Sequence, residues 1–125
     1  MTIKEVARIL DAKWICCEDM ADQDVLYAFA SDMMSDVLAH VGMDTMMLTG
    51  LINSQSVRTA EMLDVPCLMF VRGKLPHKDA VARAEMIGLP TLVTKYSMFE
   101  ACGRLYQAGM GAPKLEAFDG DGEDD

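Results

Sequence analysis

Five apolar residues in a row, Cys67-Leu68-Met69-Phe70-Val71, stand near the middle of this 125-residue chain. Pro66 precedes them and Arg72-Gly73-Lys74 follows, so residues that interrupt regular structure bound the run on both sides. A short run without polar alternation is typical of a strand that is buried on both faces of a sheet. Such a sheet needs helices on both of its faces, which predicts an α/β domain.

Strand and helix patterns alternate on either side of this run. Because helices of about ten residues separate the later strands, the sheet is expected to be mostly parallel, with about five strands, inside a three-layer α/β/α sandwich. The expected strands are residues 14–17, 25–30, 45–49, 67–71 and 91–94. The expected helices are residues 2–10, 32–41, 53–64, 78–87 and 97–108, the last opening with a Ser97–Glu100 capping box.

Cap residues set the other helix limits. Thr2, with Glu5 three residues later, forms a capping box for the first helix. Ser31 and Asp32 are good N-cap residues for the second helix, and Gly42 is expected to close it.

The chain divides into one domain, residues 1–111, and a tail, residues 112–125. The tail is rich in glycine and has six acidic and no basic residues from Glu116 to Asp125, so it is predicted to be disordered. The net charge of −9 disfavours binding to nucleic acid. No segment reaches the ~18 apolar residues of a membrane span, and no signal-peptide region is visible. A cytoplasmic protein without membrane contact is therefore expected.

Four cysteines, Cys16, Cys17, Cys67 and Cys102, lie in apolar surroundings, and no CxxC spacing occurs. Buried free thiols are expected, with no structural zinc, no other metal and no cofactor.

Motifs for catalysis are missing from the sequence. The only Gly-Lys pair, Gly73-Lys74, is followed by Leu75 where a phosphate-binding loop needs Ser or Thr, and the first glycine of that loop is missing as well. Asp36 and His40 are four residues apart and can meet on one helix face, which is the basis of an enzyme hypothesis. Favourable positions in the field of a helix dipole explain the same two residues, and the chain is predicted not to be an enzyme.

Polar or basic residues follow the ends of four predicted strands. Ligands of open α/β sheets bind at the carboxyl ends of strands, where free N–H groups of helix starts would suit a phosphate or a carboxylate. Ordinary caps and turns place the same residue types there, so both interpretations stay open. The candidate anion-binding residues are Ser31, Asp32, Thr49, Gly50, Asn53, Arg58, Arg72, Gly73, Lys74, Thr94 and Ser97, and Gln55 could join them.

Several segments together resemble one family. They are FASDMMSDVLAH (29–40), LTGL (48–51), VRTAEM (57–62), FVRGK (70–74) and SMFEAC (97–102), and the likeness extends over roughly residues 1–110. The segments resemble stand-alone DRTGG-domain proteins, a family similar to the N-terminal domain of HPr serine kinase. The literal letters D-R-T-G-G do not occur in this chain.

The resemblance implies a three-layer α/β fold, a regulatory role and a tendency to form dimers. DRTGG domains also occur in some CBS-domain pyrophosphatases, where they accompany regulation by adenine nucleotides. The leading prediction is a non-catalytic, homodimeric regulatory module that binds a small anionic or adenine-nucleotide ligand, a partner enzyme, or both. A pure protein-interaction subunit is the first alternative, and an enzyme that uses Asp36 and His40 is the second.

Methionine is unusually common, with twelve residues, and suits either a core or an adaptable contact surface. One group around the second predicted helix and third predicted strand exceeds what a small core needs, and it is the first candidate for a dimer face. Inward packing of the whole group is the alternative. The group consists of Met33, Met34, Val37, Met43, Met46 and Met47.

Overall fold

The computed structural model describes residues 1–115 of the chain, and every predicted helix and strand is present among them. The helices are α1 (Ile3–Ile9), α2 (Met34–His40), α3 (Ser54–Leu63), α4 (Lys78–Ile87) and α5 (Met98–Gln107). The strands are β1 (Lys13–Cys16), β2 (Tyr27–Ala30), β3 (Thr45–Thr49), β4 (Leu68–Phe70) and β5 (Thr91–Val93). A short 3-10 helix, η1 (Glu18–Met20), lies in the loop that follows β1. The greater part of the predicted tail, from residue 116 onward, lies outside the described residues.

The five strands form one sheet in the order β1-β5-β4-β3-β2. β2 to β5 are parallel, and β1 joins β5 antiparallel, with a bulge between Trp14 and Cys16. β4 is the central strand, and its three residues are completely buried, as the apolar run predicted. The prediction placed the start of β2 two residues too early, because Val25 and Leu26 precede the paired stretch.

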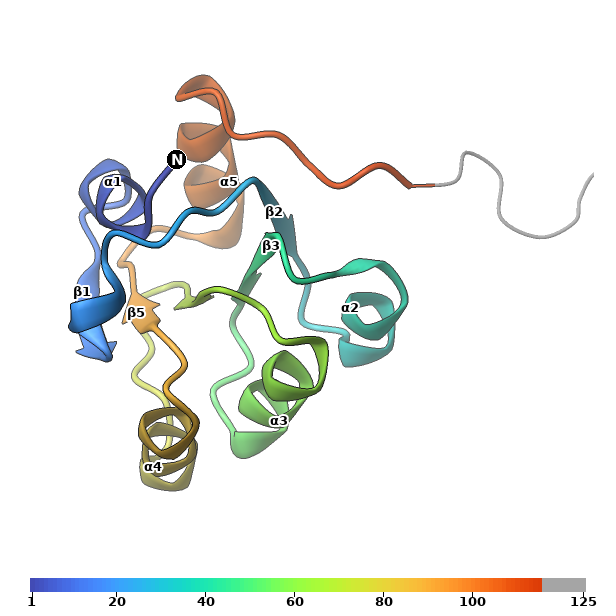
Figure 1. Cartoon of the computed structure of the whole chain (residues 1–125). Coiled ribbons are helices and arrows are strands. Elements are labelled where there is room, and N and C mark those ends of the chain that lie inside the picture. The colour runs from blue at the N-terminus through green and yellow to red at the C-terminus, as the bar shows by residue number, and fades with distance from the viewer. Residues whose placement is uncertain (116–125) are drawn as a thin grey trace, which may run out of the picture.

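Two helical layers cover the sheet (Figure 1). α1 and α5 pack on one face, where Val6 and Leu105 share a core with Met69 of β4. α2, α3 and α4 pack on the other face, where Val57 and Ala84 share a core with Phe70. Alternate residues of β4 therefore serve two separate cores, which is the three-layer α/β/α sandwich expected from the sequence.

The predicted helix caps are right in part. Thr2 and Glu5 form the full capping box, and Asn53 caps α3 by accepting from the N–H of Gln55 at 3.0 Å. Ser97 caps α5 by accepting from the N–H of Glu100 at 3.2 Å, whereas the Glu100 carboxylate turns to Arg104 instead of returning to the cap.

Two predicted caps of α2 are wrong. The N-cap position is Met33, which makes no side-chain cap bond. The carboxylate of Asp32, a predicted cap, accepts from the N–H of Gly50 instead. Val41 ends α2 in an extended conformation, so Gly42 does not supply a left-handed C-cap.

The methionine group divides between core and surface. Met46 and Met47 are completely buried on opposite faces of β3, and Met34 is buried in the first turn of α2. Met33 and Met43 are 59% and 71% exposed. Four of the six residues, counting the buried Val37, therefore point inward, and the group does not form a continuous apolar surface.

This division makes a first prediction about stability. Replacement of Met46 by Ala removes three buried heavy atoms, Cγ, Sδ and Cε, and leaves a cavity, so the free energy of unfolding should fall by roughly 2–5 kcal/mol. Met43→Ala is the matched control on the exposed side and should change it by less than about 0.5 kcal/mol. Urea unfolding followed by circular dichroism measures both. Equal losses for the two variants would contradict the core described above.

Candidate anion-binding edge

All candidate residues were expected near one edge of the sheet, and the topology explains why. β2, β3, β4 and β5 are parallel, so the loops that follow them leave from the same edge. β1 runs the opposite way, so its beginning, at Lys13, lies at this edge too. The loop after β4 leads to α4 on one face of the sheet, and the loop after β5 leads to α5 on the other. Where neighbouring loops diverge in this way, open α/β sheets form ligand crevices.

Arg72 is the most unusual residue of this edge. Its backbone is left-handed, with φ +65°, and Gly73 follows with φ +66°. A bulky residue in this region is an outlier that costs about 1–3 kcal/mol. Two backbone hydrogen bonds hold the turn in place: the N–H of Arg72 donates to the carbonyl of Tyr96, and the N–H of Gly73 to that of Thr94, both at 2.8 Å.

The side chain of Arg72 lies across Gly50. A Cβ atom at position 50 would stand 2.5 Å from Nη2 of Arg72, so only glycine allows this close approach. Gly50 is buried, whereas Arg72 is exposed. The guanidinium makes no hydrogen bond or ion pair with any other residue of the described part of the chain. Its five N–H donors therefore stay available to a ligand.

Asp32 organises the loop under Arg72. Its carboxylate accepts hydrogen bonds from the N–H of Gly50 at 2.6 Å and from Oγ1 of Thr49 at 3.1 Å. Thr49 Oγ1 in turn accepts from the N–H of Leu51 at 3.1 Å. The prediction that Gly50 offers a free N–H to a ligand is therefore wrong, because Asp32 already occupies that group.

A cavity of about 520 Å³ lies beside Gly73, between the loops that precede β1 and follow β5. Two lysines that the sequence reasoning missed, Lys13 and Lys95, line it. Lys95 forms an exposed ion pair with Asp11 at 3.4 Å, which is too exposed to hold the lysine firmly. The remaining lining residues are Asp11, Ala12, Leu75, Val93 and Thr94.

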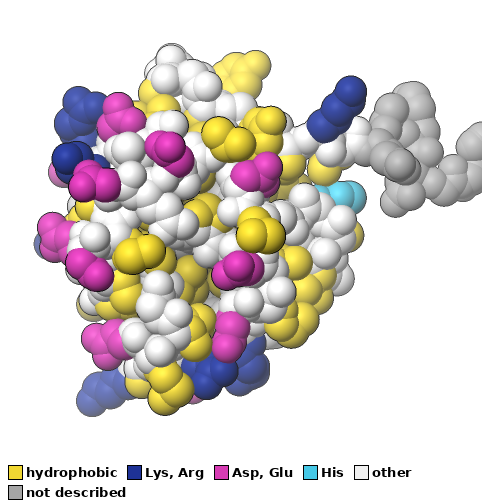
Figure 2. Space-filling model, in the orientation of Figure 1, with side chains coloured by type: hydrophobic (Ala, Val, Ile, Leu, Met, Phe, Trp, Pro, Cys, Tyr) yellow, Lys and Arg dark blue, Asp and Glu magenta, His cyan; other side chains and the backbone are white. Residues whose placement is uncertain are grey.

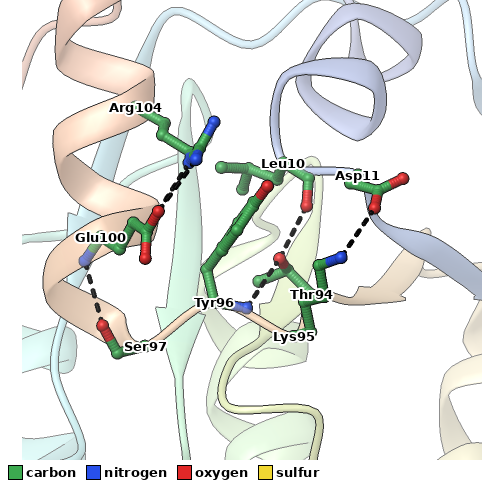
Figure 3. A network of polar contacts seen from close by, with 8 residues as sticks. All are labelled: Leu10, Asp11, Thr94, Lys95, Tyr96, Ser97, Glu100 and Arg104. Atoms are coloured by element: carbon green, nitrogen blue, oxygen red, sulfur yellow. Dashed lines mark hydrogen bonds and ion pairs between the residues drawn. The ribbon is translucent and has the colours of Figure 1, made fainter.

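Four predicted ligand residues have structural roles instead. Thr94 is buried, and its Oγ1 donates to the carbonyl of Leu10 at 2.7 Å and accepts from the N–H of Tyr96 at 3.3 Å (Figure 3). Ser97 and Asn53 are helix caps. Arg58 donates to Oγ of Ser54, one turn earlier in α3, at 3.2 Å.

Two further candidates contribute differently. Ser31 accepts from the N–H of Met33 at 3.0 Å and so shapes the turn into α2. Lys74 is exposed next to Gly73, and its side chain has no polar partner among the residues described. The structure thus brings Asp32, Thr49 and Gly50 together beneath Arg72, and leaves Arg72 and Lys74 free to meet a ligand.

Asp36 and His40 do not form a pair. The ring of His40 lies against Phe29, with ring centroids 5.8 Å apart, and no hydrogen bond joins it to Asp36. No group of three or more His, Cys, Asp or Glu side chains suited to a metal ion is found within residues 1–115.

Three of the cysteines have thiol pKa values above the ordinary value. Burial raises the pKa of Cys67 to about 12, and burial together with a hydrogen bond to Cys16 raises the pKa of Cys17 to about 11. Burial also raises the pKa of Cys102. All four cysteines are free, as predicted, although only Cys67 is fully buried. Thiols with pKa values above 8.5 are poor nucleophiles at neutral pH.

The surface charge is uneven. On the face drawn in Figure 2, acidic side chains are spread among apolar ones, and Lys and Arg side chains lie at its margins. Such a face repels an anion, whereas the edge described above presents Lys13, Arg72, Lys74 and Lys95. None of the helices described is long and apolar enough to cross a membrane.

The fold and this edge define a small α/β sandwich domain in which an arginine without a partner among residues 1–115 lies at the carboxyl ends of the parallel strands. No protein-family model and no curated protein sequence matches the chain. A solved structure does match: the CBS and DRTGG domains of the regulatory region of Clostridium perfringens pyrophosphatase, in complex with the activator diadenosine tetraphosphate, with a TM-score of 0.67. The identity is 13%, and the match covers 90% of this chain and 47% of that chain, so this chain spans about half its length. This likeness confirms the predicted DRTGG-like α/β fold.

The structural role of Thr94 makes a second prediction. Thr94→Val keeps the shape of the side chain but leaves the carbonyl of Leu10 without its partner, so the free energy of unfolding should fall by about 1–3 kcal/mol. Thr59→Val is the matched control, since Thr59 is also buried but its hydroxyl bonds to no other described residue. Chemical denaturation of both variants is the measurement. A Thr94→Val protein as stable as the parent would return Thr94 to the list of ligand candidates.

Proposed function

We propose that this protein is a non-catalytic, homodimeric regulatory module of the cytoplasm that binds a small phosphate-bearing anion at the edge around Arg72. A partner enzyme would respond to the binding of that anion. The observation that carries the proposal is the Arg72 guanidinium, which lies on Gly50 and has no partner among the described residues.

The cost of the Arg72 conformation supports a role in binding. Glycine at position 72 would remove a strain of about 1–2 kcal/mol, so a chain selected for stability alone has no reason to keep arginine there. A guanidinium binds phosphate through two parallel N–H···O hydrogen bonds. The contact with Gly50 keeps the guanidinium of Arg72 in one orientation for such binding. Lys74 and the two lysines of the neighbouring cavity add positive charge in a chain whose net charge is −9.

An adenine nucleotide is the ligand class that we favour. The cavity next to Gly73, at about 520 Å³, lies in the size range of small-molecule sites. Its apolar members Leu75 and Val93 offer a surface for a base, while the lysines of its lining, Lys13 and Lys95, can bind phosphates. The Clostridium perfringens regulatory region of similar fold is complexed with a dinucleotide activator, which supports the same class.

Ligand binding gives the third prediction. ATP, AMP and inorganic pyrophosphate, each at increasing concentration without metal, should raise the thermal midpoint, since a ligand at 100 times its Kd adds about 2.7 kcal/mol to stability. Arg72→Ala should weaken binding by at least tenfold in titration calorimetry, because a charge-assisted bidentate contact is lost. Arg72→Lys should recover only part of it, since a lysine cannot form the two parallel bonds.

The matched control is Arg83→Ala. It removes the same charge from a guanidinium that is already bound to Glu61 at 2.8 Å, so anion affinity should stay within twofold of the parent. Absence of binding by all three compounds would overturn the proposal in favour of an interaction subunit without a small ligand. Equal losses in the Arg72 and Arg83 variants would reduce the effect to net charge.

The strain at position 72 gives the fourth prediction. Arg72→Gly and Arg72→Ala both remove the guanidinium, but only glycine relaxes the left-handed backbone. Arg72→Gly should therefore be more stable than Arg72→Ala by about 1 kcal/mol, and neither should bind the anion. Guanidinium chloride unfolding of the pair measures the difference. Equal stabilities would mean that the turn is not strained.

A further inference from the structure

The outer face of α5 carries an exposed apolar stripe. Phe99, Gly103 and Tyr106 are spaced by four and three residues, so they lie in one row along the helix. Phe99 is 90% exposed and Tyr106 is 77% exposed. With Ser97, Glu100, Arg104 and Gln107 they line a shallow hollow of about 660 Å³. Two large aromatic side chains this exposed in one row are typical of an interaction surface.

Gly103 lies in the middle of this stripe, and neither its backbone conformation nor its packing within the domain requires a glycine. A glycine inside a helix costs about 1 kcal/mol relative to alanine. Its φ is not positive, so its backbone does not require glycine. A Cβ atom at this position would meet no atom within 4 Å, so packing does not require glycine either. The residue leaves a bare notch between the two aromatic side chains, where the backbone of another helix can come close.

A charged pair borders the stripe on one side. Nε and Nη2 of Arg104 both donate to one carboxylate oxygen of Glu100, at 3.1 and 2.9 Å. The guanidinium also lies over the ring of Tyr96, 4.2 Å from its centroid (Figure 3). If a second copy of this helix runs antiparallel to the first, the acidic group of each copy can pair with the basic group of the other.

The spacing fits a second copy of the same helix. With a rise of 1.5 Å per residue, Phe99 lies ~6 Å before Gly103 and Tyr106 ~4.5 Å after it. When two α5 helices cross antiparallel at their glycines, Phe99 of one copy therefore stands beside Tyr106 of the other. The twofold axis places both charged borders on the same side of the pair, so Glu100 of one copy faces Arg104 of the other.

We infer that two copies of this chain associate through the Phe99–Gly103–Tyr106 stripe of α5, as a twofold, antiparallel helix pair. This inference rests on the homodimer of the proposed function and names its surface, and it replaces the methionine group around α2 as the dimer face. The anion-binding edge does not enter into it.

The test is sedimentation equilibrium of the full chain, from 1 to 200 μM (about that range suits dimers of moderate affinity). The parent should reach twice the mass of 13.7 kDa at the upper end. Phe99→Glu should weaken association by at least a hundredfold, because it buries a charge against an aromatic ring. Met62→Glu changes an equally apolar, 70% exposed side chain on α3 and should leave association unchanged.

Gly103→Ala separates this role from a structural one. In the monomer, Gly103→Ala should raise the thermal midpoint by a few degrees. The substitution removes a glycine from the helix interior, and the added Cβ has no atom within 4 Å. At the helix crossing its methyl groups should push the copies apart and weaken association at least tenfold. A parent that dimerises while Phe99→Glu and Gly103→Ala dimerise equally well would overturn this surface and leave the proposed homodimer standing. A parent that stays monomeric at every concentration would overturn both the α5 surface and the homodimer. The anion-binding part of the proposed function is tested separately, by the dependence of binding on Arg72.

Discussion

The burial of β4 on both faces is the constraint on which the rest of this structure depends. Met69 points into the core under α1 and α5, and Phe70 points into the core under α2, α3 and α4. A strand with no exposed face has only its ends for polar groups. The basic residues of this segment, Arg72 and Lys74, therefore lie in the turn after β4, where Arg72 and Gly73 leave the sheet in left-handed conformations.

That turn joins stability to the proposed function. The left-handed Arg72 costs free energy, and the two backbone bonds to the loop after β5 hold it against this cost. Gly50, in the loop after β3, and Asp32, in the loop before α2, complete the arrangement. Gly50 leaves room for the guanidinium, and Asp32 fixes the loop beneath it. Residues from three loops are thus needed to present one arginine, which is the kind of preorganisation that a binding site requires.

The two proposed surfaces share the loop between β5 and α5. The carbonyl of Tyr96 accepts the N–H of Arg72, and the ring of Tyr96 lies under Arg104 at the border of the α5 stripe. Thr94 anchors the same loop to the end of α1 through the carbonyl of Leu10. A continuous set of packed and hydrogen-bonded groups therefore links the anion-binding edge to the α5 surface, and a binding linkage experiment on the dimer would measure the coupling between them.

Local pattern determined the elements of this protein. The run from Cys67 to Val71, the helical spacings and the caps at Thr2, Asn53 and Ser97 act over a few residues, so they can be recognised in the sequence. The same pattern placed Arg72 and Gly73 at a strand end, and hence at the candidate edge. For Asp32, Thr94 and Lys13, by contrast, only the tertiary structure decided what each residue does there. Asp32 has the chemistry of a cap but bonds to Gly50, eighteen residues away, and Thr94 bonds to Leu10, 84 residues away. Lys13 joins the edge only because β1 runs antiparallel to β5, and strand direction depends on packing between distant segments, which no local pattern records.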